Sequence, residues 1–268
     1  MNKSELFTEL YNRYGAVKRA RGCFLYTSKG VRVTDLYQED GRAILGWEGG
    51  NAFTMMKNTL SRGQTGSFIC EERPSLKLQK AVSELFASER TIFCFHSQKE
   101  AFETALSIFP DGTNFFRPWN SQNENIKLSE IPALIFTPPL PWCETIYILA
   151  LDTNKIKANP DLLLLIRGKT DIPFALEVAY TRSIYNLIKA LQEREEKNWF
   201  IYDSVLSKYW HREGPYLFPK ISEERYNDFI LYCLDCGLLI NPQFTYPSIV
   251  PFGADKGVFT KLKNSPFN

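Results

Sequence analysis

Short, nearly continuous apolar runs alternate with helical patterns along the middle of this chain. Four runs are long enough to be strands: TIFCF (91–95), ALIFTPP (133–139), ETIYILAL (144–151) and DLLLLI (161–166). A strand that is apolar at successive positions has no polar face for water, so it belongs in a sheet covered on both sides. The alternation predicts an α/β chain in which helices cover a buried sheet.

The helical patterns have apolar residues at i, i+3, i+4 and i+7. They predict helices after a Ser4 cap, over 75–88, after Ser97, around 184–191 and after a Ser222 cap. CFLYTSKGVRVTDLY (23–37) predicts two strands around a Ser-Lys-Gly turn, and GLLINP (237–242) a last strand. The polar, turn-rich residues 110–130 predict a loop.

Length and charge narrow the function classes. The 268 residues suffice for one large or two modest domains, and a net charge of +2 without a Lys/Arg block gives no reason to expect a nucleic-acid partner. The aliphatic run at 162–166 is too short for a membrane span, and the N-terminus lacks a signal-peptide pattern. With six cysteines mostly in apolar stretches, we expect reduced thiols and a cytoplasmic protein without a membrane partner.

The junction FHSQKEAFETAL (95–106) joins a strand directly to a helix. Ser97 and Glu100 have the spacing of a capping box, in which each side chain accepts a backbone N–H of the helix start. A capping box alone needs no ligand, so the local pattern predicts a helix start without requiring a function.

Three segments, in this order, resemble class III pyridoxal-phosphate (PLP) aminotransferases. RGCFLYTSKGVRVTDLY (21–37) is similar to their N-terminal hairpin, and FHSQKEAFETAL resembles their Asn-Ser-Gly-Thr-Glu-Ala helix start. GLLINPQFTYPSIVPFGADKGVF (237–259) resembles their C-terminal end, closest to the glutamate-1-semialdehyde aminotransferase branch. The resemblance implies an α/β fold of the fold-type-I PLP-transferase kind, with a small α+β domain built from both chain ends, and a homodimer.

On this resemblance, 1–45 is the N-terminal segment of the small domain, 46–198 a reduced large α/β domain and 199–268 the C-terminal small domain. Only residues 107–160 fill a stretch that is much longer in the family. Neither His96 nor His211 lies there, so the family's stacking aromatic-His-Gly motif is missing.

The departures from the family fall on the cofactor site. The family's glycine and threonine, which contact the PLP phosphate at a helix N-terminus, are replaced here by Gln98 and Lys99. Gln98 lacks the backbone freedom of glycine, whereas Lys99 offers a cation. Ser97, Gln98 and Lys99 are therefore the candidate phosphate-binding residues. Asp152 is the candidate partner of the pyridine nitrogen, or it simply ends a strand in a turn.

PDLLLLIRGKTDIPFALEV (160–178) resembles the segment around the family's Schiff-base lysine. Ile166 or Arg167 falls at the lysine position, and a guanidinium does not form the imine. Lys169 lies closer to Pro173 than the family pattern requires, and a shift of a few residues moves an amine by several ångströms. Lys169 is the catalytic candidate only on a rearranged loop, and otherwise an ordinary loop lysine.

No metal site is predicted. Cys233 and Cys236 form a CxxC pair that closes a helix, and a single pair without a nearby histidine is weak evidence for zinc. The glycine motifs of dinucleotide and P-loop sites are not present in the sequence.

Three hypotheses follow. The first is a degenerate aminotransferase-like protein that binds a small molecule or a protein partner and does not transaminate. The second is an active PLP-dependent aminotransferase using Lys169, with Ser97 and Lys99 at the phosphate. The third is one half of a split PLP enzyme. PLP is a possible cofactor under each, but under the first we expect none to be covalently bound.

Overall fold

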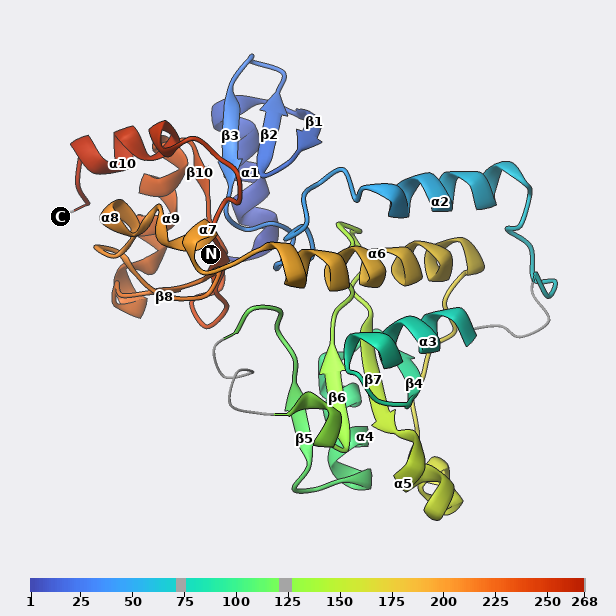
Figure 1. The fold of residues 1–268 in the computed structure, drawn as a ribbon. Helices are drawn as coiled ribbons and strands as arrows, with labels where there is room; N and C mark the ends of the chain where they lie inside the picture. The colour runs from blue at the N-terminus through green and yellow to red at the C-terminus, as the bar shows by residue number, and fades with distance from the viewer. Residues whose placement is uncertain (71–75, 121–126, 268) are drawn as a thin grey trace. The chain divides into compact units, whose positions relative to one another are not determined.

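The computed structural model describes residues 1–70, 76–120 and 127–267 (Figure 1). The chain divides into two compact units, one made of Met1–Glu48 with Glu193–Asn268 and the other of Gly49–Gln192. The first unit thus contains both ends of the chain. The domain limits expected from the sequence, at 45/46 and 198/199, remain predictions. Within the described ranges, no helix is long and apolar enough to cross a membrane.

The first unit contains two small sheets and several helices. Its strands are β1 (Val17–Arg21), β2 (Phe24–Thr27), β3 (Arg32–Asp35), β8 (Trp210–Glu213), β9 (Tyr216–Pro219), β10 (Leu238–Leu239) and β11 (Ser248–Ile249). Its helices are α1 (Lys3–Tyr14), α7 (Lys197–Phe200), α8 (Asp203–Leu206), α9 (Glu223–Asp235), η4 (Lys256–Phe259, 3-10) and α10 (Thr260–Asn264). The sheets have the orders β1-β2-β3-β10 and β11-β9-β8, and only β3 and β10 run parallel in them.

The predicted hairpin over 23–37 is confirmed as β2 and β3, which pair antiparallel around the predicted turn. The predicted Ser4 cap of the first helix is wrong. Asn2 caps α1 instead, because Asn2 Oδ1 accepts from Glu5 N at 2.9 Å while Glu5 Oε2 accepts from Asn2 N at 2.8 Å. This complete capping box begins the helix before the serine.

Asp35, at the end of β3, is fully buried and supports the turn that follows. Its carboxylate accepts hydrogen bonds from Tyr37 N at 2.9 Å, Gln38 N at 2.8 Å and Trp47 Nε1 at 2.7 Å. Residues 38–40 have φ values of 47°, 51° and 57°, a left-handed run that side chains other than glycine rarely adopt. Burial raises the pKa of Asp35 to about 7. The hydrogen bonds lower this pKa, but their effect is smaller than that of burial.

The second unit is a four-stranded mixed sheet with its helices. Its strands are β4 (Arg90–Phe95), β5 (Thr113–Phe115), β6 (Ala133–Phe136) and β7 (Tyr147–Asp152). Its helices are α2 (Asn51–Ser61), α3 (Leu76–Leu85), α4 (Gln98–Ile108), η2 (Leu128–Glu130, 3-10), α5 (Thr153–Ala158), η3 (Pro160–Leu165, 3-10) and α6 (Phe174–Glu193), the last ending one residue past the unit limit. The order is β4-β7-β6-β5, with β7 antiparallel to both neighbours and β5 parallel to β6.

Both faces of this sheet are buried, as the apolar runs predicted. On one face, α4 packs its Ala101 and Ala105 against Ile135 and Leu149. On the opposite face, Phe136 lies 5.4 Å from Phe86, which follows α3, measured between ring centroids. Every residue of β6 is buried, so this strand has no polar face. The expected α/β architecture is confirmed.

Arg90 begins β4 and is completely buried. Its Nε donates to Ser88 Oγ at 2.8 Å, Nη1 to the Ile131 carbonyl at 2.6 Å and Nη2 to the Leu128 carbonyl at 2.7 Å. Burial lowers the pKa of the guanidinium, and Asp152 raises it. The side chain fastens the start of β4 to the segment that leads into β6.

The fourth apolar run and the predicted loop differ from expectation. DLLLLI (161–166) is not a buried strand: residues Pro160–Leu165 form a 3-10 helix on which Leu164 is 76% exposed. Pro160 at its first turn favours a helical start, and the sheet places no strand there. Within 110–130, Thr113–Phe115 forms β5, which pairs with β6, while 121–126 lie outside the described residues.

Candidate functional site

The start of α4 is a capped helix terminus at the end of β4. Ser97 is the N-cap, and its Oγ accepts from Glu100 N at 3.3 Å, which is one half of the predicted capping box. The backbone N–H groups of a helix start attract anions. The acidic Glu100 in this first turn opposes that attraction. The start of α4 is therefore well capped, and the negative charge of Glu100 offsets the positive potential of the backbone N–H groups there.

Gln98 and Lys99 occupy the first two helical positions. Gln98 is partly buried. The Lys99 side chain is 82% exposed, and its Nζ lies 3.7 Å from Glu103 Oε1, one turn further along the helix. The cation is therefore directed along the surface of α4 toward a carboxylate.

Lys169 lies at the same end of β4 as Ser97. The next residue, Thr170, donates its N–H to the Cys94 carbonyl at 2.8 Å, which attaches the Lys169 loop to the strand end. The Lys169 side chain is exposed, and its Nζ lies 6.0 Å from the centre of the Phe93 ring. The structure thus brings Lys169 near Ser97, but it leaves the amine in water.

Asp152 lies at the opposite end of the sheet from Ser97. In the β4–β7 register Phe95 pairs with Tyr147 and Arg90 with Asp152, so about 17 Å of strand separates the two ends. Asp152 is the N-cap of α5, accepting from Asn154 N at 2.8 Å and Lys155 N at 3.2 Å. The structure therefore does not bring Asp152 together with Ser97, Gln98, Lys99 and Lys169.

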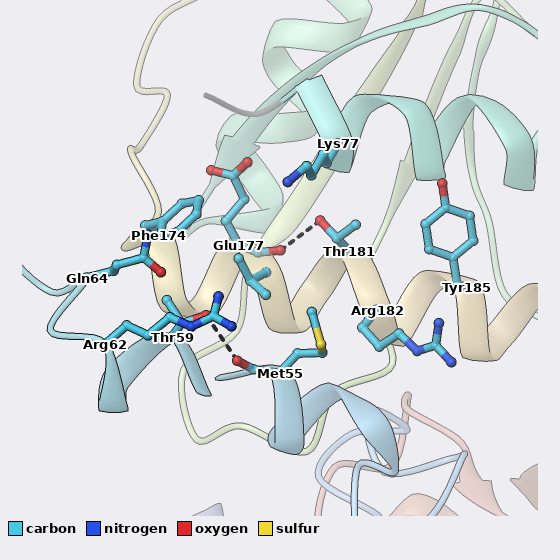
Figure 2. A pocket seen from close by; sticks show the side chains of 11 residues that line it. Met55, Thr59, Arg62, Gln64, Lys77, Phe174, Glu177, Thr181, Arg182 and Tyr185 are labelled. Carbon is cyan, nitrogen blue, oxygen red and sulfur yellow. Dashed lines mark hydrogen bonds between the residues drawn. The ribbon is translucent and has the colours of Figure 1, made fainter. Parts of the chain in front are cut away.

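A cavity of about 330 Å³ lies among α2, α3 and α6 (Figure 2). One face of α6 forms its longest wall, because positions three and four apart lie on the same side of a helix. The residues of this face are Phe174, Glu177, Val178, Thr181, Arg182 and Tyr185. Thr181 Oγ1 donates to the Glu177 carbonyl at 2.9 Å, within the helix.

The other walls come from α2, the turn after it and α3. Met55 and Thr59 lie one turn apart on α2, Arg62 is its C-cap residue, and Gln64 follows in the turn. Lys77 is the second residue of α3. Figure 2 shows Arg62 and Lys77 reaching toward the α6 face from two sides.

Charged side chains of both signs line the cavity. Among the described lining residues, three are cationic, Arg62, Lys77 and Arg182, and Glu177, which is 7% exposed, is a carboxylate. Among the described residues, the Nε atom of Arg182 is one of four buried side-chain polar atoms without a hydrogen-bond partner. The pKa of the Tyr185 hydroxyl is raised mainly by burial and to a lesser extent by the negative charge of the nearby Glu84. The lining combines cations with aromatic and aliphatic surface.

Sequence reasoning did not find this cavity. Its residues come from 55–64, 77 and 174–185, which share no motif. The available signal was the α6 face, where polar and charged residues, Glu177, Thr181 and Arg182, recur at helical spacing beside Phe174. Such spacing indicates a helix face that is neither plain core nor plain surface.

The cysteines of the described residues are all free thiols. Burial raises the pKa of Cys94, beneath the start of α4, to about 12. Cys233 is fully buried at the end of α9, and burial raises its pKa as well. In the ranges that the structure covers, no three His, Cys, Asp or Glu side chains are grouped to hold a metal ion.

Two proteins of similar sequence match over most of this chain. An uncharacterized protein of Treponema pallidum is 27% identical over 91% of this chain and 91% of its own length. An uncharacterized protein of Borreliella burgdorferi is 28% identical over 96% of this chain and 92% of its own length. No protein-family model matches the chain.

Solved structures of similar fold are PLP-dependent enzymes. The acetylornithine aminotransferase of Elizabethkingia anophelis has a TM-score of 0.64 at 13% identity, covering 98% of each chain. The ornithine aminotransferase of Plasmodium yoelii has a TM-score of 0.62 at 14% identity, covering 98% of this chain and 97% of that one. Serine palmitoyltransferase of S. paucimobilis, solved with a PLP–myriocin aldimine, has a TM-score of 0.64 at 10% identity, covering 97% and 95%. The chain therefore has the fold of PLP-dependent aminotransferases, in reduced form.

Proposed function

We propose that this protein binds a small molecule on an aminotransferase-type scaffold and does not transaminate. The observation that carries the proposal is the α2–α3–α6 cavity, whose volume of about 330 Å³ lies at the lower end of the range of small-molecule sites. Its lining of apolar side chains with a few charged groups is also typical of such sites. A binding role needs no reactive amine, which agrees with the position of Lys169.

The residues at the start of α4 do not fit covalently held PLP. A Schiff-base lysine has to lose its proton near neutral pH, which requires a desolvated pocket or a neighbouring cation. Lys169 is exposed, and its loop is attached to β4 by Thr170. Asp152 caps α5 at the far end of the sheet, where it cannot pair with a ring nitrogen near Ser97.

Borohydride reduction after incubation with PLP, followed by peptide mass mapping, tests this proposal. We expect no stoichiometric adduct at Lys169 and no amino-group transfer from amino donors. Lys99→Ala is the matched control, because Lys99 is an exposed lysine at the same end of the sheet. A stable Lys169 adduct that persists in Lys99→Ala and disappears in Lys169→Ala would instead establish the active-enzyme hypothesis.

We propose further that two copies associate through the surface of η3 and α4. These two helices are in contact, and they expose Leu106 at 46%, Leu164 at 76% and Leu165 at 40%. Contiguous exposed apolar residues, such as Leu164 and Leu165, are more typical of interfaces than of free surface. Sedimentation velocity should show a dimer that Leu164→Glu converts to monomer, whereas a monomeric wild-type protein would refute this part of the proposal.

A further inference from the structure

We infer that the α2–α3–α6 cavity binds a small oxyanion, a carboxylate or a phosphate group, carried on a compact apolar body. This inference rests on the proposed binding function and adds the chemical class of the ligand. It is carried by the unpaired buried Nε of Arg182 in the cavity lining, which also includes the cationic side chains of Arg62 and Lys77.

The cations come from three different elements. Arg62 is the C-cap residue of α2, Lys77 is the second residue of α3 and Arg182 lies in the middle of α6. All three line the cavity (Figure 2). Arg62 and Lys77 are exposed at its rim, whereas Arg182 is partly buried. An anion bound in the cavity would be attracted by each of these cations. The buried carboxylate of Glu177 lies in the same lining.

Arg182 gives the most specific indication. Its Nε is buried and, among the described residues, has no hydrogen-bond acceptor. A buried guanidinium nitrogen without an acceptor is costly and indicates a missing water, ion or ligand. Carboxylate and phosphate groups accept two parallel hydrogen bonds from a guanidinium, including the one from Nε. An oxyanion at this point would satisfy the unpaired donor directly.

The remaining lining residues indicate the size and polarity of the part of the ligand that carries the anionic group. Met55, Phe174, Val178 and Tyr185 give it aliphatic and aromatic surface. The volume of about 330 Å³ equals that of roughly ten liquid waters. A bare inorganic anion would leave the apolar surface wet, whereas a compact ligand of about this volume would cover it. The lining therefore favours a compact aromatic or aliphatic body with one anionic group.

Isothermal titration with matched probes tests the inference. Phenyl phosphate and 3-phenylpropionate carry the two possible head groups on similar bodies, and 3-phenylpropanamide is the neutral counterpart of the second. We expect at least one anion to bind about tenfold or more tightly than the amide, with an affinity that falls as salt is raised. The tighter of the two anions identifies the head group. Equal binding of anions and amide, or no binding of either anion, would overturn the inference.

Variants locate the binding. Arg182→Gln and Lys77→Gln should each weaken anion binding, Arg182→Gln by about tenfold. Lys57→Gln on α2 and Lys80→Gln on α3 are matched controls, because both lysines are exposed and lie outside the cavity lining. Lys77 is at the rim, so its variant tests the site even if Arg182→Gln fails to fold. Unchanged anion affinity in Lys77→Gln would refute this location.

The outcomes separate the two proposals. If the amide binds as well as the anions, the binding function stands and the oxyanion class is wrong. If Lys169 forms a PLP adduct and turns over amino donors, the non-transaminating function is wrong while the anion result is unaffected.

Discussion

Thr170 Oγ1 lies 2.9 Å from Nε2 of His96, and His96 is the residue that directly follows β4. On the other side of the same ring, Glu144 Oε1 lies 3.3 Å from His96 Nδ1. These contacts join the Lys169 loop, the end of β4 and the segment before β7. Together with the bond from Thr170 N to the Cys94 carbonyl, they hold the Lys169 loop against the strand end.

Replacing the Thr170 hydroxyl should loosen this attachment. Thr170→Val keeps the shape of the side chain but removes the hydrogen bond to His96, so we expect a loss of about 0.5–1.5 kcal/mol in the free energy of unfolding. Urea titration measures the loss, with Thr170→Ser as the control that keeps the hydroxyl. An equal loss in both variants would mean that the hydroxyl bond is not responsible.

Asp152 is expected to matter for stability and not for binding. Asp152→Ala removes the N-cap of α5 and should lower the free energy of unfolding by about 1 kcal/mol. Asp152→Asn keeps an accepting oxygen and should cost less. Phenyl phosphate titrations of both variants should match the wild type, and a changed affinity would contradict the placement of Asp152 away from the ligand.

Asp35 should make stability depend on pH. Burial raises its pKa from 3.8 to about 7 in the folded protein. The folded state therefore holds the proton more tightly than the unfolded state, and the stabilisation is fully present below about pH 4 and is lost as pH rises toward 7. The full change is up to about 4 kcal/mol.

Asp35→Asn isolates this effect from the other titrating groups. Between pH 4 and 7 the free energy of unfolding of the wild type should fall relative to that of the variant, whatever the offset between them. Thermal or urea unfolding across this range gives both curves. Parallel curves would show that Asp35 titrates with its ordinary pKa.

The thiols should differ strongly in their rate of alkylation. Cys143 is exposed, whereas Cys23 and Cys94 are buried, and burial raises the pKa of both to about 12. Because the thiolate is the reactive form, iodoacetamide at pH 8 should label Cys143 first. Peptide mass spectrometry gives the order, with urea-unfolded protein as the reference in which all sites react. Early labelling of Cys94 in the native protein would contradict its burial.

Local signals in the sequence were sufficient where an element depends on its own residues. The Ser97 cap with Glu100 three positions later predicts the start of α4. The Ser-Lys-Gly turn predicts the β2–β3 hairpin, where Gly30 has φ 75°. The run at 161–166 could not be assigned in this way, because four consecutive leucines suit a buried strand and a short helix equally. Only the pairing of β7 with β4 and β6 shows that the sheet has no strand there.

The candidate site was less predictable than the fold. Asp152 and Ser97 are close to strand ends in the sequence, but only the antiparallel register shows that these strand ends lie at opposite edges of the sheet, about one strand length apart. Likewise, Arg62, Lys77 and Arg182 come to line one cavity only after three helices have packed. A resemblance that covers separate patches of sequence indicates the scaffold, whereas the position of an amine or a cation depends on tertiary structure.

Arg90 donates from every guanidinium nitrogen to a neutral oxygen, two of them backbone carbonyls. Acidification cannot protonate these acceptors, and dissolved ions do not screen contacts of this kind as they screen surface ion pairs. The hydrogen bonds that connect the start of β4 to the segment before β6 should therefore persist at low pH and at high salt concentration. Under those conditions, unfolding of this protein should begin in another part of the chain.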